Sequence, residues 1–249
     1  MVEADELTRR YGSFTAADQI SFSIARGEIF GLLGPNGAGK STTFKMLCGL
    51  LRPTSGRALV AGIDVVKQTS DARSRLGYMA QKFSLYGDLS VAQNLDFFAG
   101  VYGLAGSRRR RAVERVTEAF GLRRYMETSA GTLPMGYKQR LALSCAVMHE
   151  PPVLFLDEPT SGVDPLTRRE FWAHINALVQ GGVTVMVTTH FLDEAEYCDR
   201  IALVYRGRVI ASGSPDELKA HARTTALPDP TLEDAFVALV AADAGKLAA

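Results

Sequence analysis

Short apolar runs alternate with amphipathic stretches along most of this chain. Helical patterns lie between most of the runs, and strands that are apolar throughout are typical of sheets covered on both faces. The alternation therefore predicts an α/β fold with a largely parallel sheet. Strands are expected at Glu28–Leu33, Arg57–Ala61, Leu76–Ala80, Val153–Leu156, Thr184–Thr189 and Arg200–Tyr205.

The segment Ser90–Arg124 breaks this alternation. It contains two helical patterns, at about Val91–Tyr102 and Arg109–Phe120, with no strand pattern between them. This predicts a helical insertion within the α/β core. Nearer the end of the chain, Ala222–Pro230 contains two prolines and is expected to be a linker, followed by a short amphipathic helix at Thr231–Ala242.

Composition places the chain among folded proteins of ordinary size. Its 249 residues are 47% hydrophobic and 22% charged, enough apolar surface to offset the entropy of ordering one or two domains. The formal net charge of +1 argues against a broad nucleic-acid-binding surface. Its three cysteines, Cys48, Cys145 and Cys198, lie far apart, form no metal-binding motif and suit a reducing compartment.

The hydrophobic runs are too short to be membrane spans. No apolar stretch approaches the roughly 20 residues that cross a bilayer. The start of the chain, Met1–Arg10, is acidic at several positions and lacks the apolar core of a signal peptide. Any link to a membrane is therefore expected to come through a partner or another segment.

The strongest local signal is a match to the phosphate-loop pattern GxxxxGK[ST]. The loop follows the apolar run Ile29–Leu33 and opens the helical pattern Ser41–Leu51, which is the strand–loop–helix order that such a site requires. Glycines let backbone N–H groups surround a phosphate, and the helix N-terminus adds a positive dipole end. The expected nucleotide-binding residues are Gly34, Pro35, Asn36, Gly37, Ala38, Gly39, Lys40, Ser41 and Thr42.

Two acids at the end of a later apolar run provide the second part of such a site. Asp157 and Glu158 directly follow Val153–Leu156. A carboxylate at the strand end can join the Mg²⁺ shell, and the next one can polarise the water that attacks the γ-phosphate. Apolar residues followed by acids are a weak signal alone, so this prediction depends on the phosphate loop upstream.

Further elements, in the same order, resemble the ATP-binding subunits of ABC (ATP-binding cassette) transporters over about Leu7–Ala220. Tyr11, followed by Gly12, resembles the aromatic loop that stacks on adenine, and Gln81 resembles the glutamine of the Q-loop. His190 directly follows an apolar run and resembles the switch histidine. Asp164 ends a stretch similar to the D-loop and precedes a proline, so it is also expected to cap a helix.

The resemblance implies a fold and a division of the chain. The fold is a P-loop NTPase (RecA-like) core with a largely parallel sheet, an N-terminal antiparallel β region and a helical insertion. The chain is expected to be a single ATP-binding domain, residues 1–249. Its core would cover about 1–81 and 136–221, its helical subdomain about 82–135, and its C-terminal helix about 231–242.

The resemblance also implies the chemistry of the site. ATP and Mg²⁺ are the expected cofactors. The expected Mg²⁺ ligands are Ser41, Gln81 and Asp157. The expected catalytic residues are Glu158, His190, Gln81 and Lys40.

The signature loop departs from the family pattern. That pattern is usually Leu-Ser-Gly-Gly-Gln, and it meets the γ-phosphate bound to the opposite subunit. The corresponding residues of this chain after Leu133 are Pro134, Met135, Gly136 and Tyr137. Pro134 supplies neither a hydroxyl nor an N–H group, and a lost hydrogen bond to a charged group is worth roughly 1.5–3 kcal/mol. The helix N-terminus remains, so we expect a weakened contact.

The resemblance implies an exporter subunit, and it is strongest to a subgroup of bacterial drug exporters of the ABC-2 type. The expected partners are a second ATP-binding domain, in a homodimer or a heterodimer, and transmembrane permease domains, with no nucleic acid. The expected location is cytoplasmic, peripheral on the inner face of the cell membrane. Two alternatives stay open: a soluble cassette acting on ribosomes, and a regulatory cassette that binds ATP but hydrolyses it poorly. A DNA-repair cassette fits badly, because Gln81 to Leu133 has no room for a long coiled coil.

Overall fold

Strands buried along their whole length form the centre of a six-stranded sheet. In the computed structural model, which describes the backbone of residues 1–248 and the side chains of residues 1–243, this sheet has the order β10-β9-β3-β8-β7-β6. All neighbours pair in parallel except β10, which runs antiparallel to β9. The strands are β3 (Ile29–Leu33), β6 (Leu76–Met79), β7 (Val153–Asp157), β8 (Thr184–Thr189), β9 (Arg200–Tyr205) and β10 (Arg208–Gly213).

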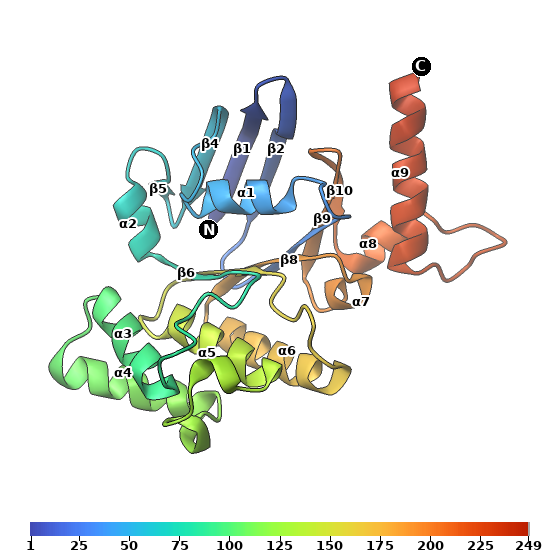
Figure 1. Ribbon diagram of the computed structural model, residues 1–249. Coiled ribbons are helices and arrows are strands. Elements are labelled where there is room, and N and C mark those ends of the chain that lie inside the picture. The colour runs from blue at the N-terminus through green and yellow to red at the C-terminus, as the bar shows by residue number, and fades with distance from the viewer. Residues whose placement is uncertain (249) are drawn as a thin grey trace.

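A second, antiparallel sheet covers the helix that follows the phosphate loop. Its order is β2-β1-β4-β5, and helix α1 (Lys40–Leu47) lies between the two sheets (Figure 1). The buried ring of Phe44 on α1 meets Phe155 of β7 edge-on, with ring centroids 5.4 Å apart. Apolar packing on both sides therefore holds α1 in place. The strands of this sheet are β1 (Val2–Tyr11), β2 (Phe14–Ile24), β4 (Ser55–Val60) and β5 (Ile63–Asp64).

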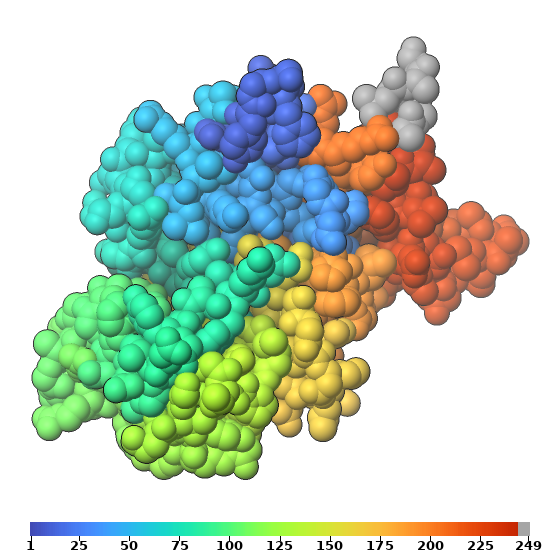
Figure 2. All heavy atoms as spheres, viewed as in Figure 1, coloured from blue at the N-terminus to red at the C-terminus, as the bar shows by residue number. Residues whose placement is uncertain are grey.

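Helices cover the other face of the six-stranded sheet. Helix α5 (Met135–Val147) and helix α6 (Pro165–Gln180) lie against it, and α3 (Val91–Val101) and α4 (Gly106–Ala119) lie farther out (Figure 1). Figure 2 shows the part of the chain with α3, α4 and α5, in green to yellow-green, as a lobe below the blue N-terminal strands. Trp172 of α6 is fully buried in the shared core, as its place on an amphipathic helix predicts.

The remaining elements are short, apart from the last helix. Within residues 1–248, none of the helices combines the length and the apolar character that crossing a membrane requires. The remaining elements of the fold are α2 (Thr69–Ser74), two 3-10 turns (Arg123–Tyr125 and Ala130–Thr132), α7 (Leu192–Ala195), α8 (Pro215–Ala220) and α9 (Leu232–Ala248).

The predicted fold class is confirmed, and several element bounds agree with the sequence patterns. Strands β8 and β9 have the bounds that the patterns predict, and helix α6 begins directly after Asp164, as predicted. Helix α1 ends at Leu47, four residues earlier than predicted, because the chain turns at Gly49 with a positive φ of 66°. Helix α4 begins at Gly106, before the predicted Arg109, and α9 continues past the predicted Ala242.

Candidate nucleotide site

The phosphate loop connects the end of β3 to the start of α1. Gly39 has a φ of 100°, and a Cβ atom there would lie 2.3 Å from the backbone oxygen of Ala16. A Cβ atom on Gly34 would lie 2.2 Å from the backbone oxygen of Val204. These close approaches leave no room for a side chain, so the loop conformation requires glycine at both positions.

Lys40 lies inside the loop. Its side chain is buried, and its Nζ donates hydrogen bonds to the backbone oxygens of Gly34 (2.7 Å) and Pro35 (3.1 Å). Burial lowers the pKa of Lys40, and the nearby carboxylates of Glu158 and Asp157 act in the opposite direction. The two backbone hydrogen bonds therefore anchor the ammonium group within the loop.

A cleft of about 300 Å³ opens beside the loop. It brings together most of the predicted nucleotide-binding residues with three of the four predicted catalytic ones, Lys40 among them. Tyr11, Gly34 and Pro35 are not among the residues that line it, whereas Phe14 is. The lining residues are Phe14, Ala16, Asn36, Gly37, Ala38, Gly39, Lys40, Ser41, Thr42, Gln81 and Glu158.

The two aromatic residues near this cleft differ in their surroundings. Tyr11 lies at the end of β1, half exposed, with the guanidinium carbon of Arg9 4.6 Å from its ring centroid. Phe14 starts β2 across the same turn, is 63% exposed and reaches the cleft. The adenine contact of Tyr11 stays a prediction, and Phe14 is a lining residue that the sequence pattern did not single out.

Asp157 ends β7 in a buried position. Its Oδ1 accepts a hydrogen bond from the hydroxyl of Thr188 on the neighbouring strand β8, at 2.5 Å. Burial raises the pKa of Asp157, and the lysines Lys40 and Lys45 partly offset this shift. Together with the Ser41 hydroxyl, this carboxylate gives the hard oxygen donors that Mg²⁺ prefers, so the residues fit the predicted ion.

Glu158 meets two residues from distant parts of the chain. Its Oε2 accepts a hydrogen bond from Nε2 of Gln81 (2.8 Å) and lies 3.1 Å from Nδ1 of His190. The predicted catalytic residues other than Lys40 thus form one cluster. Glu158 itself is only 7% exposed, whereas Gln81 is exposed and the side chain of His190 is 31% exposed, so the cluster lies at the border between the core and solvent.

The backbone at Glu158 is itself unusual. Its φ of 46° lies in the left-handed region, which residues other than glycine rarely adopt and which costs of order 1–3 kcal/mol. The N–H group of Glu158 is bonded to Thr188, 3.0 Å from its hydroxyl and 3.1 Å from its backbone oxygen. Thr188 therefore orients both acids, a role that a threonine within an apolar run does not reveal from sequence.

The signature loop forms the first turn of α5. Pro134 directly precedes this helix, and a Cβ atom on Gly136 would lie 2.3 Å from Cγ2 of Thr167, so glycine allows α5 and α6 to approach. The hydroxyl of Tyr137 accepts a hydrogen bond from Nη2 of Arg124 at 2.6 Å. These contacts hold the altered loop in a defined conformation.

The signature loop lies next to the D-loop rather than the phosphate loop. The four signature residues line a cavity of about 430 Å³ that Gly162, Val163 and Asp164 also line, and this cavity shares no lining residue with the phosphate cleft. Asp164 caps α6 as predicted, because its Oδ1 accepts from the N–H groups of Leu166 and Thr167. Hydrogen bonds from Thr167 and Leu166 lower the pKa of Asp164.

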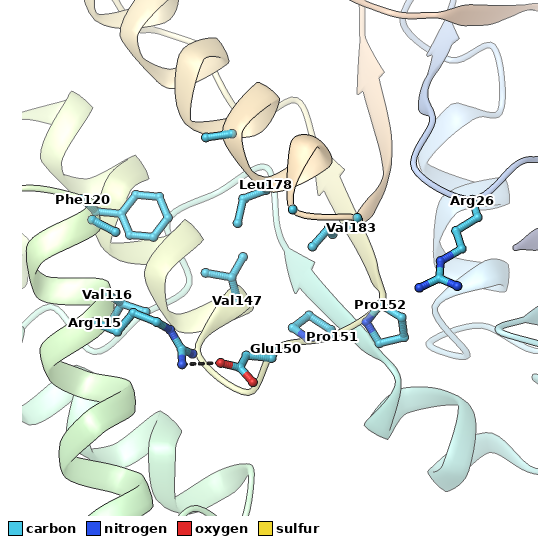
Figure 3. Close-up of a pocket in the computed structure, with 14 residues that line it drawn as sticks. Arg26, Arg115, Val116, Phe120, Val147, Glu150, Pro151, Pro152, Leu178 and Val183 are labelled. Carbon is cyan, nitrogen blue, oxygen red and sulfur yellow. Dashed lines mark hydrogen bonds and ion pairs between the residues drawn. The ribbon is translucent and has the colours of Figure 1, made fainter.

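A larger cavity, of about 510 Å³, lies at the edge where β7 and β8 begin (Figure 3). Its walls are mainly apolar, with Phe120, Val147 and Leu178 among them, and Arg115 pairs with Glu150 at its border. None of the predicted site residues lines it. The phosphate cleft, at the other ends of the parallel strands, is the smaller of the two, so chemistry rather than size identifies the nucleotide site.

A glycine-rich loop between a parallel strand and a helix, beside a buried acidic strand end, defines a P-loop nucleotide-binding protein. Comparison with known families is more specific, since the family described as "ABC transporter" matches residues 17–161. The chain therefore belongs to the ABC transporter family, in agreement with the resemblance of its motifs.

Curated relatives are similar over most of this chain. It is 65% identical, over 96% of its length, to the "Probable multidrug ABC transporter ATP-binding protein YbhF" of Escherichia coli, and spans 42% of that protein. It is 42% identical, over 88% of its length, to the "Daunorubicin resistance ATP-binding protein DrrA3" of Streptomyces coeruleorubidus, and spans 70% of that protein. The chain thus covers less than half of the YbhF relative.

Solved structures show the same fold. A structure titled "Structure of ATP binding subunit of ABC transporter" is 30% identical, with a TM-score of 0.85, over 96% of this chain and 99% of the other. The ATP-binding cassette MJ0796 was solved as a dimer in a post-hydrolysis state bound to ADP and Pi. It is 25% identical to this chain, with a TM-score of 0.77, over 86% of this chain and 98% of MJ0796.

Proposed function

We propose that this chain binds ATP with Mg²⁺ in the phosphate cleft and hydrolyses it to drive export. The observation that carries this proposal is the contact of Glu158 with Gln81 and His190 beside the loop that holds Lys40. The names of the relatives support an ATP-binding role in drug export. Calorimetry with ATP tests the proposed binding, and a phosphate-release assay tests the proposed hydrolysis.

The proposed reaction is an in-line attack by water on the γ-phosphate. Lys40 and the backbone N–H groups at the start of α1 stabilise the charge that develops on the phosphate oxygens. Glu158 orients the water or accepts its proton, while Gln81 and His190 hold the carboxylate of Glu158. Ser41, Asp157 and Gln81 would hold Mg²⁺, which would supply positive charge next to the outer phosphates.

The proposed assembly contains a second ATP-binding domain and transmembrane permease domains at the cytoplasmic face of the membrane. Residues 1–249 would form one ATP-binding domain, with residues 82–135 as its helical subdomain. The separation between the signature cavity and the phosphate cleft supports dimerisation, because one chain does not bring its own signature loop to its own phosphate loop. The dimer of MJ0796 with ADP and Pi supports the same arrangement.

Restoring the family signature is expected to strengthen ATP-dependent dimerisation. In a Glu158→Gln background, which blocks hydrolysis, the chain should dimerise poorly, and adding Pro134→Ser with Met135→Gly should raise the dimer fraction. The reason is a hydroxyl contact missing at both sites of a homodimer, roughly 3–6 kcal/mol in all if nothing compensates. Sedimentation velocity with and without ATP·Mg²⁺ measures the change.

The matched control for this experiment is Pro134→Ala. It restores the backbone N–H group at this position without adding a hydroxyl, so it isolates the hydroxyl contact and should leave the dimer fraction below that of the serine variant. A tight ATP dimer formed with the natural signature would show that the helix N-terminus suffices, and a partner with its own signature would not be needed. With Glu158 in place, binding of ATP with little hydrolysis under either signature would favour the regulatory alternative, which the departure at Pro134 and Met135 keeps open.

A further inference from the structure

Glu194 is a buried acid outside the predicted site. It belongs to the short helix α7, four residues after His190, and is 1% exposed. A buried carboxylate is costly unless it is hydrogen-bonded and paired, so its contacts are informative. Its two oxygens accept hydrogen bonds from the hydroxyls of Thr160 and Thr189, and Nε of Arg168 lies 3.4 Å from its Oε1.

The contact with Thr189 acts on the segment that carries His190. The hydroxyl of Thr189 donates to Oε2 of Glu194 at 2.7 Å and accepts from the N–H group of Phe191 at 3.0 Å. One hydroxyl therefore ties together the residues on both sides of His190, and Glu194 sets the direction in which that hydroxyl points.

The contact with Thr160 acts on the segment that carries Glu158. Thr160 is fully buried, lies two residues after Glu158 and directly precedes the D-loop. The backbone closes a turn at this point, because the N–H group of Ser161 donates to the oxygen of Glu158 at 3.2 Å. Glu194 thus joins the loop after β7, which carries Glu158, to the loop after β8, which carries His190.

Arg168 of α6 closes the other side of this cluster. Its guanidinium carbon lies 4.6 Å from the ring centroid of Phe191, and its Nη1 lies 2.9 Å from Oδ2 of Asp193. The side chain of Asp193 is 69% exposed, whereas that of Glu194 is 1% exposed. The two neighbouring acids therefore share a cation, and of these two acids it is Glu194 that accepts the hydrogen bonds of the two threonine hydroxyls.

We propose that Glu194 is a positioning residue for hydrolysis, which acts by holding Thr160 and Thr189 so that His190 stays against Glu158. This inference rests on the proposed role of Glu158 and His190 in the reaction. Loss of the Glu194 carboxylate frees both loops without touching the phosphate loop, so it should misplace the catalytic groups while leaving ATP binding intact.

The test compares Glu194→Ala and Glu194→Gln with the control Asp193→Asn. The direct readout is the imidazole ¹H–¹⁵N signal of His190, one of only four histidines, assigned with His190→Ala. Glu194→Ala should shift this signal and lower kcat about tenfold or more with KM changed less than about twofold. Glu194→Gln can still accept a hydrogen bond from a threonine hydroxyl, so it should partly restore the wild-type His190 signal and the wild-type kcat. Asp193→Asn should change neither the signal nor kcat.

The outcomes separate this inference from the proposed function. If Glu194→Ala leaves the His190 signal and kcat unchanged, the cluster only supports stability and the inference is wrong, even if the melting temperature falls. If the signal shifts while His190→Ala hydrolyses ATP like the wild type, the coupling holds but the proposed role of His190 fails. If the chain alone hydrolyses ATP too slowly for kinetic measurements, the imidazole signal of His190 in the folded Glu194→Gln variant decides whether the inference holds.

Discussion

Glu158→Gln is expected to remove most ATP hydrolysis while ATP still binds. The amide keeps the size of the side chain and can still accept the hydrogen bond from Gln81, but it cannot take a proton from water. Loss of a general base typically lowers the rate about 10²–10⁴-fold. Phosphate release at saturating ATP·Mg²⁺ measures the rate, and calorimetry measures the affinity.

A suitable control is Glu150→Gln, which makes the same chemical change at the border of the large cavity. The side chain of Glu150 is 72% exposed and pairs with Arg115 there, so its variant should keep the wild-type rate. His190→Ala should act in the same direction as Glu158→Gln. Wild-type turnover in the Glu158 variant would mean that a different group activates the water.

Lys40→Ala is expected to weaken ATP binding strongly. Lys40 is the cation held within the phosphate loop, and a hydrogen bond to a charged group is worth about 1.5–3 kcal/mol, which corresponds to a loss in affinity of about 10- to 100-fold. The substitution also removes the donor from the backbone oxygens of Gly34 and Pro35, so the loop should lose order. Titration calorimetry with ATP·Mg²⁺ measures the loss.

Lys67→Ala is the matched control, because Lys67 is an exposed lysine that does not line the phosphate cleft. Its variant loses the same charge without touching the loop, so its affinity should stay close to that of the wild type. Thermal unfolding of both variants checks that they are folded. Equal affinities of Lys40→Ala and the wild type would place phosphate binding elsewhere on the chain.

Local sequence patterns were sufficient for the elements that carry the site. A short run rich in β-branched residues, such as Thr184–Thr189, is typical of a strand buried between two layers, and Asp164 with Pro165 marks the start of α6 independently of the rest of the chain. The phosphate loop is also local, because its glycines and Lys40 lie within eight residues. The sequence alone therefore determined the fold class, the phosphate loop and the order of the motifs.

Only the tertiary structure decided which side chains meet. Gln81 and Glu158 are 77 positions apart, yet the order β3-β8-β7-β6 brings the ends of their strands to one edge of the sheet. The same order places Thr188 beside Asp157 and lets Glu194 reach back to the loop after β7. Such contacts depend on strand order and loop closure, which pair residues without a periodic pattern between them.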